Sequence, residues 1–497
     1  MTPTELLAEM PAGSRLHTPR GASEQVDVRL VDITHDSRLA GPGVLFACRP
    51  GQRVDGHDFA PQAVAAGSPA LLVERHCDLA VPQIVVPSVA DTLGPAAAAV
   101  HGHPSRALML IGITGTNGKT TTAYLLESAL RAAGHVTGLI GTVQTIVAGQ
   151  ATPGARTTPE STDLQRLFKR MVDSGVTAAV MEVSSHGLAL GRVAATSFAV
   201  AVFTNLSQDH LDFHADLEDY YAAKARLFLP AHTRVGVVNV DDPWGRRLAT
   251  TAPVTMLRVS PSGAATDGDV VAVDVEAERI GWTVTVACAG RRLRLRTRLP
   301  GRFNVANALC ALAAAHACGI ELDDAVDGIA ALDGVPGRME RVDAGQPFTV
   351  LVDYAHTPDS VANVLAAARD LANPGRVLAV VGCGGDRDPT KRSLMGRAAA
   401  ELADLTVMTS DNPRSEDPLV ILDMMVSGAR AVPRAAWTVE PDRRAAIALA
   451  LQAAEAGDVV VIAGKGHEPY QEVAGQILPF DDRLVARELL ETVEVAT

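Results

Sequence analysis

The 497-residue sequence has no run of 18 apolar residues, and its start, MTPTELLAEMPAG, has neither a basic region nor a long apolar segment. The first absence argues against a membrane-spanning helix, and the second argues against a secretory signal peptide. The six cysteines include no CxxC pair, which favours buried or free thiols of a reduced compartment over a disulfide or metal framework. We therefore expect a cytoplasmic protein.

Basic residues are in the minority, since 44 Lys and Arg stand against 57 Asp and Glu, and the net charge is -13. Binding to nucleic acid or an anionic membrane needs a basic face, so we expect neither as a partner. A polyanionic substrate must then be met by local clusters of cations. The chain is 47% apolar and 20% charged, which is typical of a globular protein. At about 100 to 200 residues per domain, its length predicts about three domains.

Apolar runs of strand length alternate with helical segments, which predicts an α/β protein. We expect a small N-terminal α/β domain over residues 1–107 and a central phosphate-loop α/β domain with a mostly parallel sheet over 108–338. A second doubly wound α/β domain should occupy residues 339–497. Residues 270–300 alternate more regularly than their surroundings, which predicts an antiparallel excursion before a helix that begins near Asn304.

The stretch MLIGITGTNGKTTT, residues 109–122, begins as a buried strand, turns through Gly115 and Gly118, and continues as a helix. Such a turn holds phosphate, because its backbone N–H groups aim at one point and glycines let an anion approach closely. Lys119 would reach the terminal phosphates, and the Thr120 hydroxyl would bind Mg²⁺. Ile113 stands where the general pattern has glycine, so the loop is a shortened variant. The alternative is an ordinary strand-to-helix turn.

Polar residues at the ends of two other predicted strands suit a metal ion. Glu182 follows the strand that begins at Ala178, and a carboxylate in that place can bind Mg²⁺, which prefers oxygen ligands. The alternative for Glu182 is a helix cap. His210, in the segment TNLSQDHLD, would add a further metal contact or support one.

Lys224 lies in the predicted helix EDYYAAKARLF, and the residue pattern alone favours a solvated cation there. Near Mg²⁺ and phosphates, an ammonium group would be repelled by the metal. A lysine that has taken up CO₂ becomes a carbamate, which is an anion able to bridge metal ions. Both interpretations of Lys224 stay open at this point.

Several donors at predicted element boundaries suit anionic ligands. Hydroxyl and guanidinium groups that fit a phosphorylated or carboxylated substrate come from Thr157, Thr158 and Arg192. Groups able to meet a nucleotide base, phosphate or ribose come from Asn304, Arg338 and Asp353. Ordinary surface roles are equally compatible with each of these residues taken alone.

In the last third of the chain, the segments GCGGDRDP, DNPR and GKGHE each follow a predicted strand. Parallel strands would bring cations and anions to one sheet edge, which suits a zwitterion. The residues concerned are Arg387, Asp411, Asn412, Pro413, Arg414, Gly464 and Glu468. The alternative is a structural network of ion pairs.

The order of the motifs TGTNGKTTT, MEVSSHGL, FTNLSQDHLDFH, YYAAKARLF, GRFNVANALCA, DYAHTPDS, GCGGDRDPTKRSLMGR, SDNPRSEDP and GKGHE resembles the Mur ligases of peptidoglycan synthesis. The resemblance covers all three domains. It implies an ATP-dependent amide ligase that adds diaminopimelate to the D-glutamyl side chain of UDP-N-acetylmuramoyl-L-Ala-D-Glu through an acyl phosphate. It further implies Mg²⁺, a Rossmann-like C-terminal domain and, in our expectation, a monomer.

The resemblance also assigns roles to residues. It implies that ATP meets Gly115, Thr116, Asn117, Gly118, Lys119, Thr120, Thr121, Asn304, Arg338 and Asp353. It implies that the UDP-muramoyl-dipeptide meets His35, Ser37, the loop from Gln52 to Asp55, Thr157, Thr158, Ser184 and Arg192. It implies a catalytic role for Lys119, Glu182, His210 and Lys224. It implies that magnesium binds to Thr120, Glu182, His210 and the carbamate form of Lys224. It implies that the amino acid binds to the seven C-terminal residues named above. Leu190 stands where the family has glutamine.

The DNPR segment is similar to the diaminopimelate-selecting form of the family, whose lysine-adding relatives have no arginine at the position of Arg414. Diaminopimelate carries a distal carboxylate that lysine lacks, and a buried guanidinium without that partner would be costly. The sequence does not separate meso- from LL-diaminopimelate. Alternatives are a lysine-adding ligase, a folylpolyglutamate synthetase-like ligase or, in another class, a nucleotide-dependent switch.

Overall fold

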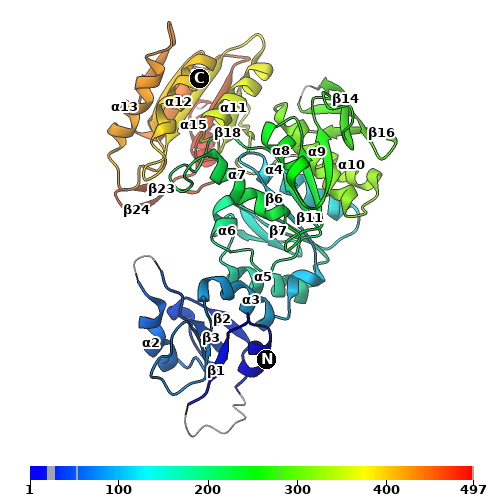
Figure 1. Cartoon of the computed structure of the whole chain (residues 1–497). Helices are drawn as coiled ribbons and strands as arrows, with labels where there is room; N and C mark the ends of the chain where they lie inside the picture. The colour runs from blue at the N-terminus through cyan, green and yellow to red at the C-terminus, as the bar shows by residue number, and fades with distance from the viewer. Residues whose placement is uncertain (20–27, 52–53, 279, 495–497) are drawn as a thin grey trace.

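The computed structural model describes residues 1–19, 28–51, 54–278 and 280–494, and the architecture below refers to these ranges. Three sheets follow one another along the chain, and each is covered by helices. Figure 1 shows them as a blue N-terminal body, a cyan-to-green central body and a yellow-to-red C-terminal body. The predicted α/β class and three-domain organisation are therefore confirmed.

The N-terminal sheet has the strand order β1-β5-β4-β3-β2, with β1 antiparallel to β5 and the other strands parallel. Buried aliphatic residues of β3 to β5 pack against the alanine face of α3, which explains the run PAAAAV. The elements are α1 (Pro3–Ala8), β1 (Arg15–His17), β2 (Asp32–Thr34), β3 (Val44–Ala47), α2 (Ala60–Ala65), β4 (Leu71–Val73), β5 (Gln83–Val85) and α3 (Val89–Val100).

The central sheet has the order β16-β15-β14-β13-β12-β11-β6-β10-β7-β8-β9, and its middle from β14 to β7 is parallel. Its first elements are β6 (Met109–Thr114), α4 (Lys119–Ala132), β7 (Thr137–Ile140), β8 (Gln144–Val147), β9 (Gln150–Pro153), α5 (Ser161–Asp173), β10 (Ala178–Glu182), α6 (Ser185–Ala189), β11 (Val200–Phe203), α7 (Leu217–Ala225), β12 (Val235–Asn239) and α8 (Pro243–Thr251). Because β6 lies between β10 and β11, the residues after these three strands meet at one edge.

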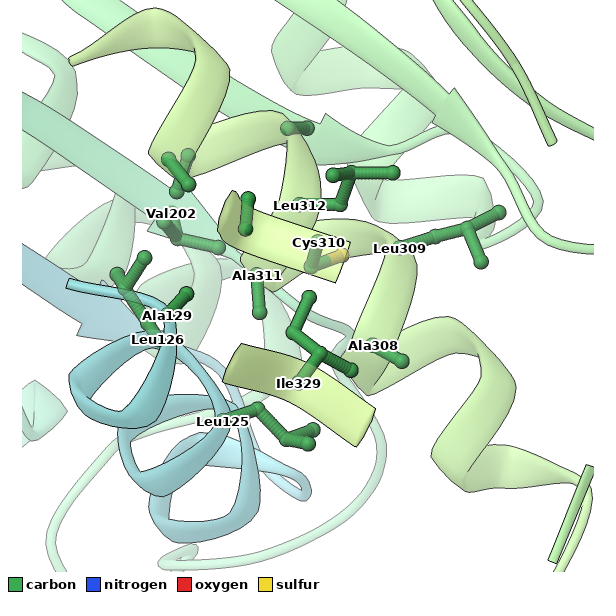
Figure 2. Close-up of a cluster of buried hydrophobic side chains, with 14 of the residues drawn as sticks. Leu125, Leu126, Ala129, Val202, Ala308, Leu309, Cys310, Ala311, Leu312 and Ile329 are labelled. Atoms are coloured by element: carbon green, nitrogen blue, oxygen red, sulfur yellow. The ribbon is translucent and has the colours of Figure 1, made fainter. Parts of the chain in front are cut away.

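The predicted antiparallel excursion is confirmed by β14 (Val270–Ala277), β15 (Trp282–Cys288) and β16 (Arg291–Thr297), which follow β13 (Thr255–Ser260). The helix predicted from Asn304 is α9 (Phe303–Ala317), and α10 (Leu322–Ala331) follows it. Figure 2 shows side chains of α4, α9 and α10 packed together next to Val202 of β11. The glycine at position 328 allows helices α4 and α10 to cross closely. A Cβ on Gly328 would lie only 2.5 Å from the Ala129 Cα.

The C-terminal sheet has the order β17-β18-β22-β19-β20-β21, with β17 antiparallel and the rest parallel. A separate hairpin, β23–β24, lies beside it. The elements are β17 (Glu340–Val342), β18 (Thr349–Asp353), α11 (Pro358–Ala372), β19 (Val377–Cys383), α12 (Thr390–Leu402), β20 (Leu405–Ser410), α13 (Pro418–Ala429), β21 (Trp437–Val439), α14 (Arg443–Ala453), β22 (Val459–Ala463), β23 (Tyr470–Val473), β24 (Gln476–Pro479) and α15 (Asp482–Glu494).

Polar contacts join the central body to both of its neighbours. Toward the N-terminal body, the Arg166 guanidinium on α5 donates to the Asp32 carboxylate on β2 at 2.8 Å. Toward the C-terminal body, the Asn117 amide donates to the Asp359 carboxylate in the first turn of α11 at 2.8 Å. The phosphate loop therefore contacts the C-terminal body directly.

A fully buried ion pair connects strands of the C-terminal sheet at its carboxyl edge. The Arg443 guanidinium donates to Asp482 at 2.7 and 2.8 Å, and neither side chain is exposed. It also donates to the carbonyls of Ser410 at 3.3 Å and Ala463 at 3.0 Å, the last residues of β20 and β22. These strands flank β19, so one guanidinium ties together the ends of two strands that do not pair.

We expect Arg443→Met to lower the free energy of unfolding of the protein by about 3–5 kcal/mol, because it leaves the Asp482 carboxylate buried without a partner. The double variant Arg443→Met/Asp482→Leu removes both charges and should recover most of this loss. Urea unfolding followed by circular dichroism measures both changes. A single variant as stable as the wild type would show that Asp482 finds another partner.

Candidate active site

The phosphate loop joins β6 to α4, as the sequence predicted, and two glycines in it have backbone conformations that favour glycine. Gly115 has φ +152°, and a Cβ there would lie 1.9 Å from the Thr204 Oγ1. Gly118 has φ +85° and precedes the first residue of α4. The Thr204 hydroxyl donates to the Asn117 carbonyl at 2.6 Å, so the residue after β11 closes the loop.

Lys119 folds back over the loop, where its Nζ donates to the carbonyls of Gly115 at 3.0 Å and Thr116 at 2.8 Å. Burial lowers the pKa of Lys119, and the nearby Glu182 carboxylate opposes that shift. The ammonium is thus held by neutral carbonyls at the mouth of the loop, a place from which it can turn toward an anion.

Glu182, the last residue of β10, is buried, and neutral donors surround its carboxylate. The Thr120 hydroxyl lies 3.0 Å from both carboxylate oxygens, and Thr142 donates its N–H at 2.8 Å and its hydroxyl at 3.1 Å. No Lys, Arg or His in the part of the chain that the structure describes forms an ion pair with Glu182. The helix-cap alternative is wrong, because Ser184 caps α6 by accepting from the Gly187 N–H.

His210 lies at the rim of the same site with φ +57°. Burial lowers its pKa to about 3, against the opposing effect of the Asp209 carboxylate, whose Oδ2 lies 3.4 Å from the His210 Nε2. The imidazole is therefore neutral near pH 7 and has a free lone pair. Asp209 also lies 3.8 Å from Lys391 and 3.9 Å from His356 of the C-terminal body.

Lys224 is 1% exposed, so the interpretation of it as a solvated cation is wrong. Helix α7 turns this side chain inward, where its Nζ donates to the Gly115 carbonyl at 2.8 Å and lies 4.3 Å from the centre of the Tyr220 ring. Burial lowers the pKa of Lys224 well below its ordinary value, and the nearby Lys119 lowers it further. Tertiary packing, which the sequence pattern does not report, decides this environment.

The phosphate loop, Glu182 and His210 line one cavity of about 370 Å³ between the central and C-terminal bodies. Asn304, Arg338 and Asp353 line the same cavity, so the three predicted nucleotide contacts come together with the loop. Arg338 donates to the Thr120 hydroxyl at 3.1 Å and lies 4.6 Å from the Tyr354 ring centre. Burial raises the pKa of Asp353, which accepts from two backbone N–H groups at 2.7 Å.

The predicted dipeptide contacts lie next to Glu182. Thr158 donates its hydroxyl to the Glu182 carbonyl at 3.0 Å and accepts from the Ser184 N–H at 2.9 Å. Thr157 pairs with the Thr142 hydroxyl at 2.9 Å. Arg192 donates to the Thr158 carbonyl at 3.2 Å and pairs with Glu160 at 2.8 Å. Thr157 and Ser184 line the cavity together with the phosphate loop.

His35 and Ser37 line a second cavity of about 930 Å³ between the N-terminal and central bodies. Three guanidinium groups, from Arg38, Arg156 and Arg170, line it as well, together with the carboxylates of Asp36, Glu160 and Asp163. Arg38 pairs with Asp36 and Arg156 with Glu160. Of the predicted loop from Gln52 to Asp55, residues 52 and 53 lie outside the described residues. Asp55 caps a short 3₁₀ helix and pairs with Arg75 at 2.7 Å, which is a structural role.

The predicted C-terminal residues meet at the carboxyl edge of their sheet. The Asn412 amide donates to the Glu468 carboxylate at 2.8 Å. Gly464 leaves room for the Asp411 side chain, because a Cβ on Gly464 would lie 2.6 Å from the Asp411 Oδ2. Arg414, with φ +54°, donates to the Gly385 carbonyl at 2.6 Å. A Cβ on Gly384 would lie 3.0 Å from Arg414 and 3.9 Å from Arg387.

Tyr354 connects this cluster to the 370 Å³ cavity. It lines the cavity, and its hydroxyl donates to the Glu468 carboxylate at 3.2 Å. Four further residues of these sites were not predicted from the sequence: Tyr354, Thr142, Asp209 and Lys465. Thr142 follows β7, so the rule that selected Glu182, polar residues just after parallel strands, would have found it. The other three take their importance from contacts between segments far apart in the sequence.

The described residues bear on three further expectations. Their cysteines are free, as predicted. Within the ranges described, no helix is both long and apolar enough to cross a membrane. In the same ranges no group of three or more His, Cys, Asp or Glu side chains is placed to hold a metal ion by itself. A metal at Glu182 would therefore need further ligands, such as hydroxyls, phosphate oxygens or water.

Family models match most of the chain: "Mur ligase family, catalytic domain" at residues 30–112, "Mur ligase middle domain" at 113–315 and "Mur ligase, glutamate ligase domain" at 337–466. The chain is 50% identical to the UDP-N-acetylmuramoyl-L-alanyl-D-glutamate–2,6-diaminopimelate ligase of Streptomyces coelicolor, over 98% of this chain and 97% of that protein. It is also 50% identical to the Streptomyces avermitilis protein of that name, over 95% of both. A solved structure with this name matches at a TM-score of 0.67 and 33% identity, over 94% of this chain and 95% of the other.

We expect Gly115→Ala to weaken ATP binding at least tenfold, a loss of about 1.4 kcal/mol. A Cβ would displace the Thr204 hydroxyl, which closes the phosphate loop. Titration calorimetry measures the affinity. Gly334→Ala is the control, because a Cβ at this exposed position meets nothing within 4 Å. Equal affinities of the two variants would contradict the assigned geometry of the loop.

Proposed function

The chain belongs to the Mur ligase family, and we propose that it joins 2,6-diaminopimelate to the D-glutamyl side-chain carboxylate of UDP-N-acetylmuramoyl-L-alanyl-D-glutamate at the expense of ATP. The observation that carries the proposal is the junction at Tyr354. This residue lines the cavity of the phosphate loop and donates to Glu468 of the C-terminal cluster. The proposed sites of ATP and of the amino acid would thus be neighbours, so that an acyl phosphate formed at the first lies close to the amine held at the second.

ATP is proposed to bind with its phosphates on residues 115–121 and its nucleoside toward Asn304, Arg338 and Asp353. The loop offers backbone N–H groups at the start of α4, where the helix dipole favours an anion. Lys119 would exchange its two carbonyl partners for phosphate oxygens. An ammonium in this place stabilises the negative charge of the transferring phosphoryl group.

Magnesium is proposed at the buried Glu182 carboxylate. Thr120, Glu182 and the neutral His210 would hold the ion, with Lys224 if it carries a carbamate, and phosphate oxygens or water would complete the ligand set. The donors fit a hard cation, because Glu182 is negative, buried and bonded to neutral groups. When bound, the ion neutralises charge on the phosphates.

The reaction balances in two steps. An oxygen of the D-glutamyl carboxylate attacks the γ-phosphorus of ATP, and ADP leaves, which gives an acyl phosphate. The amine of diaminopimelate then attacks the acyl carbon, loses a proton, and phosphate leaves with the bridging oxygen. Thr157, Thr158, Ser184 and Arg192 would hold the glutamyl end beside Glu182, and His35 and Ser37 would hold the UDP end in the second cavity.

The diamino acid is proposed to bind at Arg387, Asp411, Asn412, Pro413, Arg414, Gly464 and Glu468. Guanidinium forks suit its two carboxylates, and the Glu468 carboxylate suits an ammonium group. Arg414 lacks a bidentate carboxylate partner in the described residues, since Glu472 lies 3.5 Å from its Nε. The distal carboxylate of diaminopimelate would supply this partner.

Phosphate release by the purified protein tests the proposed function. We expect release that depends on both UDP-muramoyl-dipeptide and diaminopimelate, and that Lys119→Ala abolishes. A panel with lysine and LL- and meso-diaminopimelate reads the amino-acid preference. Release that depends on neither substrate would favour a nucleotide-dependent switch, and a preference for lysine would favour a lysine-adding ligase.

We expect Lys224→Ala to lower the rate on the order of a hundredfold. Burial lowers the pKa of Lys224 well below its ordinary value, which favours the neutral amine, the form that takes up CO₂. If the carbamate is the working group, short carboxylic acids should partly restore the rate of the alanine variant. An unchanged rate, or a loss that no carboxylic acid relieves, would argue against it.

We expect Arg414→Gln to lower kcat/KM for diaminopimelate by roughly 10- to 100-fold, because a charge-assisted hydrogen bond contributes about 1.5–3 kcal/mol. The rate with lysine should change far less, because lysine has no distal carboxylate. The ratio of the two kcat/KM values is the measurement. Parallel losses with both amino acids would remove the selective role of Arg414.

A further inference from the structure

Lys465 lies within the GKGHE segment and is 0% exposed, yet its ammonium is surrounded by acceptors. Its Nζ donates to the Asn412 side-chain oxygen at 3.2 Å, the Glu468 carboxylate at 3.4 Å and the Tyr470 carbonyl. Three donors thus meet three acceptors, which satisfies a buried ammonium. Two of the acceptors belong to side chains that we assign to amino-acid binding.

These contacts fix the orientation of the Asn412 amide. Its Oδ1 receives the Lys465 ammonium and also the Glu472 N–H at 3.0 Å, and both of these groups can only donate. The other end of the amide, Nδ2, must therefore point away from them, and it donates to the Glu468 carboxylate at 2.8 Å. A flipped amide would set donor against donor at Lys465.

Lys465 also acts on the charge of Glu468. Burial raises the pKa of Glu468, the neighbouring Asp411 raises it further, and Lys465 and Asn412 oppose these effects. The charged and titratable groups around this carboxylate are Asp411, Tyr354, Tyr470, Arg443 and Lys465. Of the two cations, Arg443 is already paired with Asp482. The unshared positive charge beside Glu468 is therefore that of Lys465.

We propose that Lys465 is a positioning residue of the amino-acid site, whose buried ammonium orients the Asn412 amide and keeps the Glu468 carboxylate ionised to receive the ammonium group of the diamino acid. The inference rests on the proposed function, because it takes that carboxylate as the acceptor. Lys465 is completely covered by protein and acts through the side chains of Asn412 and Glu468.

A purely structural lysine would leave substrate affinity unchanged after its loss. The Glu468 side chain is 18% exposed, whereas the Lys465 side chain is 0% exposed, so solvent reaches Glu468 but not the lysine. Oε1 also receives the Tyr354 hydroxyl, which lines the nucleotide cavity. Lys465 thus controls a carboxylate that lies between the two proposed ligands.

The test compares Lys465→Met and Lys465→Gln with the wild-type enzyme. We expect the KM for diaminopimelate to rise at least tenfold at pH 7.5, while the KM values for ATP and UDP-muramoyl-dipeptide stay within about twofold. Without the cation, protonation of Glu468 occurs at higher pH. The acidic limb of log(kcat/KM) for diaminopimelate should therefore move up by about one pH unit or more.

Arg376→Met serves as the control in the same domain. Arg376 pairs with Asp458 at 2.7 Å. These two residues precede β19 and β22, so they lie at the edge of the sheet opposite to the amino-acid cluster. The loss of Arg376 should lower stability without moving either the KM for diaminopimelate or the acidic limb. Melting temperatures of all variants separate a loss of stability from a change at the site.

Lys465→Arg provides a second measurement if neither neutral variant folds. It keeps the charge but changes the donor geometry, so the acidic limb should stay in place while the KM for diaminopimelate rises. An unchanged KM in any folded Lys465 variant, or equal rises in all three KM values, would overturn the inference. A wild-type enzyme that does not use diaminopimelate would instead overturn the proposed function.

Discussion

The Glu182 carboxylate lies at the end of β10, where it is buried and bonded to neutral donors. A buried carboxylate without a counter-ion is costly, so the site favours whatever cation completes it. The residues around it are arranged accordingly. Thr120 comes from the start of α4, Thr142 from the end of β7 and Arg338 from the segment before the C-terminal sheet. A phosphate-bound cation would satisfy this charge and the phosphate loop together.

Polar contacts join the central body to the C-terminal body. Asn117 of the phosphate loop donates to Asp359 at the start of α11, and Asp209 lies near Lys391 and His356. Each pair joins the central body to the C-terminal body beside the 370 Å³ cavity. A change in the phosphate loop could therefore reach the C-terminal body through the Asn117–Asp359 hydrogen bond, beside the apolar packing of Phe303 against the C-terminal core. Polar junctions of this kind can break and re-form as substrates enter and leave.

The carboxyl edge of the C-terminal sheet is organised from within by two buried cations. Arg443 holds the ends of β20 and β22, from which the DNPR and GKGHE segments emerge. Lys465 then joins these segments by their side chains, Asn412 from one and Glu468 from the other. Arg443 thus holds the backbone of these two loops, and Lys465 holds their side chains.

The sequence by itself determined the α/β class, the phosphate loop and the polar residues that follow each parallel strand, because strand–loop–helix patterns and glycine placement are local properties. The tertiary structure alone decided the burial of Lys224 and Lys465. Lysine on a helix or in a loop is ordinarily solvated, and only the packing of α7 against the phosphate loop buries Lys224. Likewise, Lys465 meets Asn412 across 53 residues of chain. Burial of such a group depends on packing between segments far apart in sequence, and no local pattern records it.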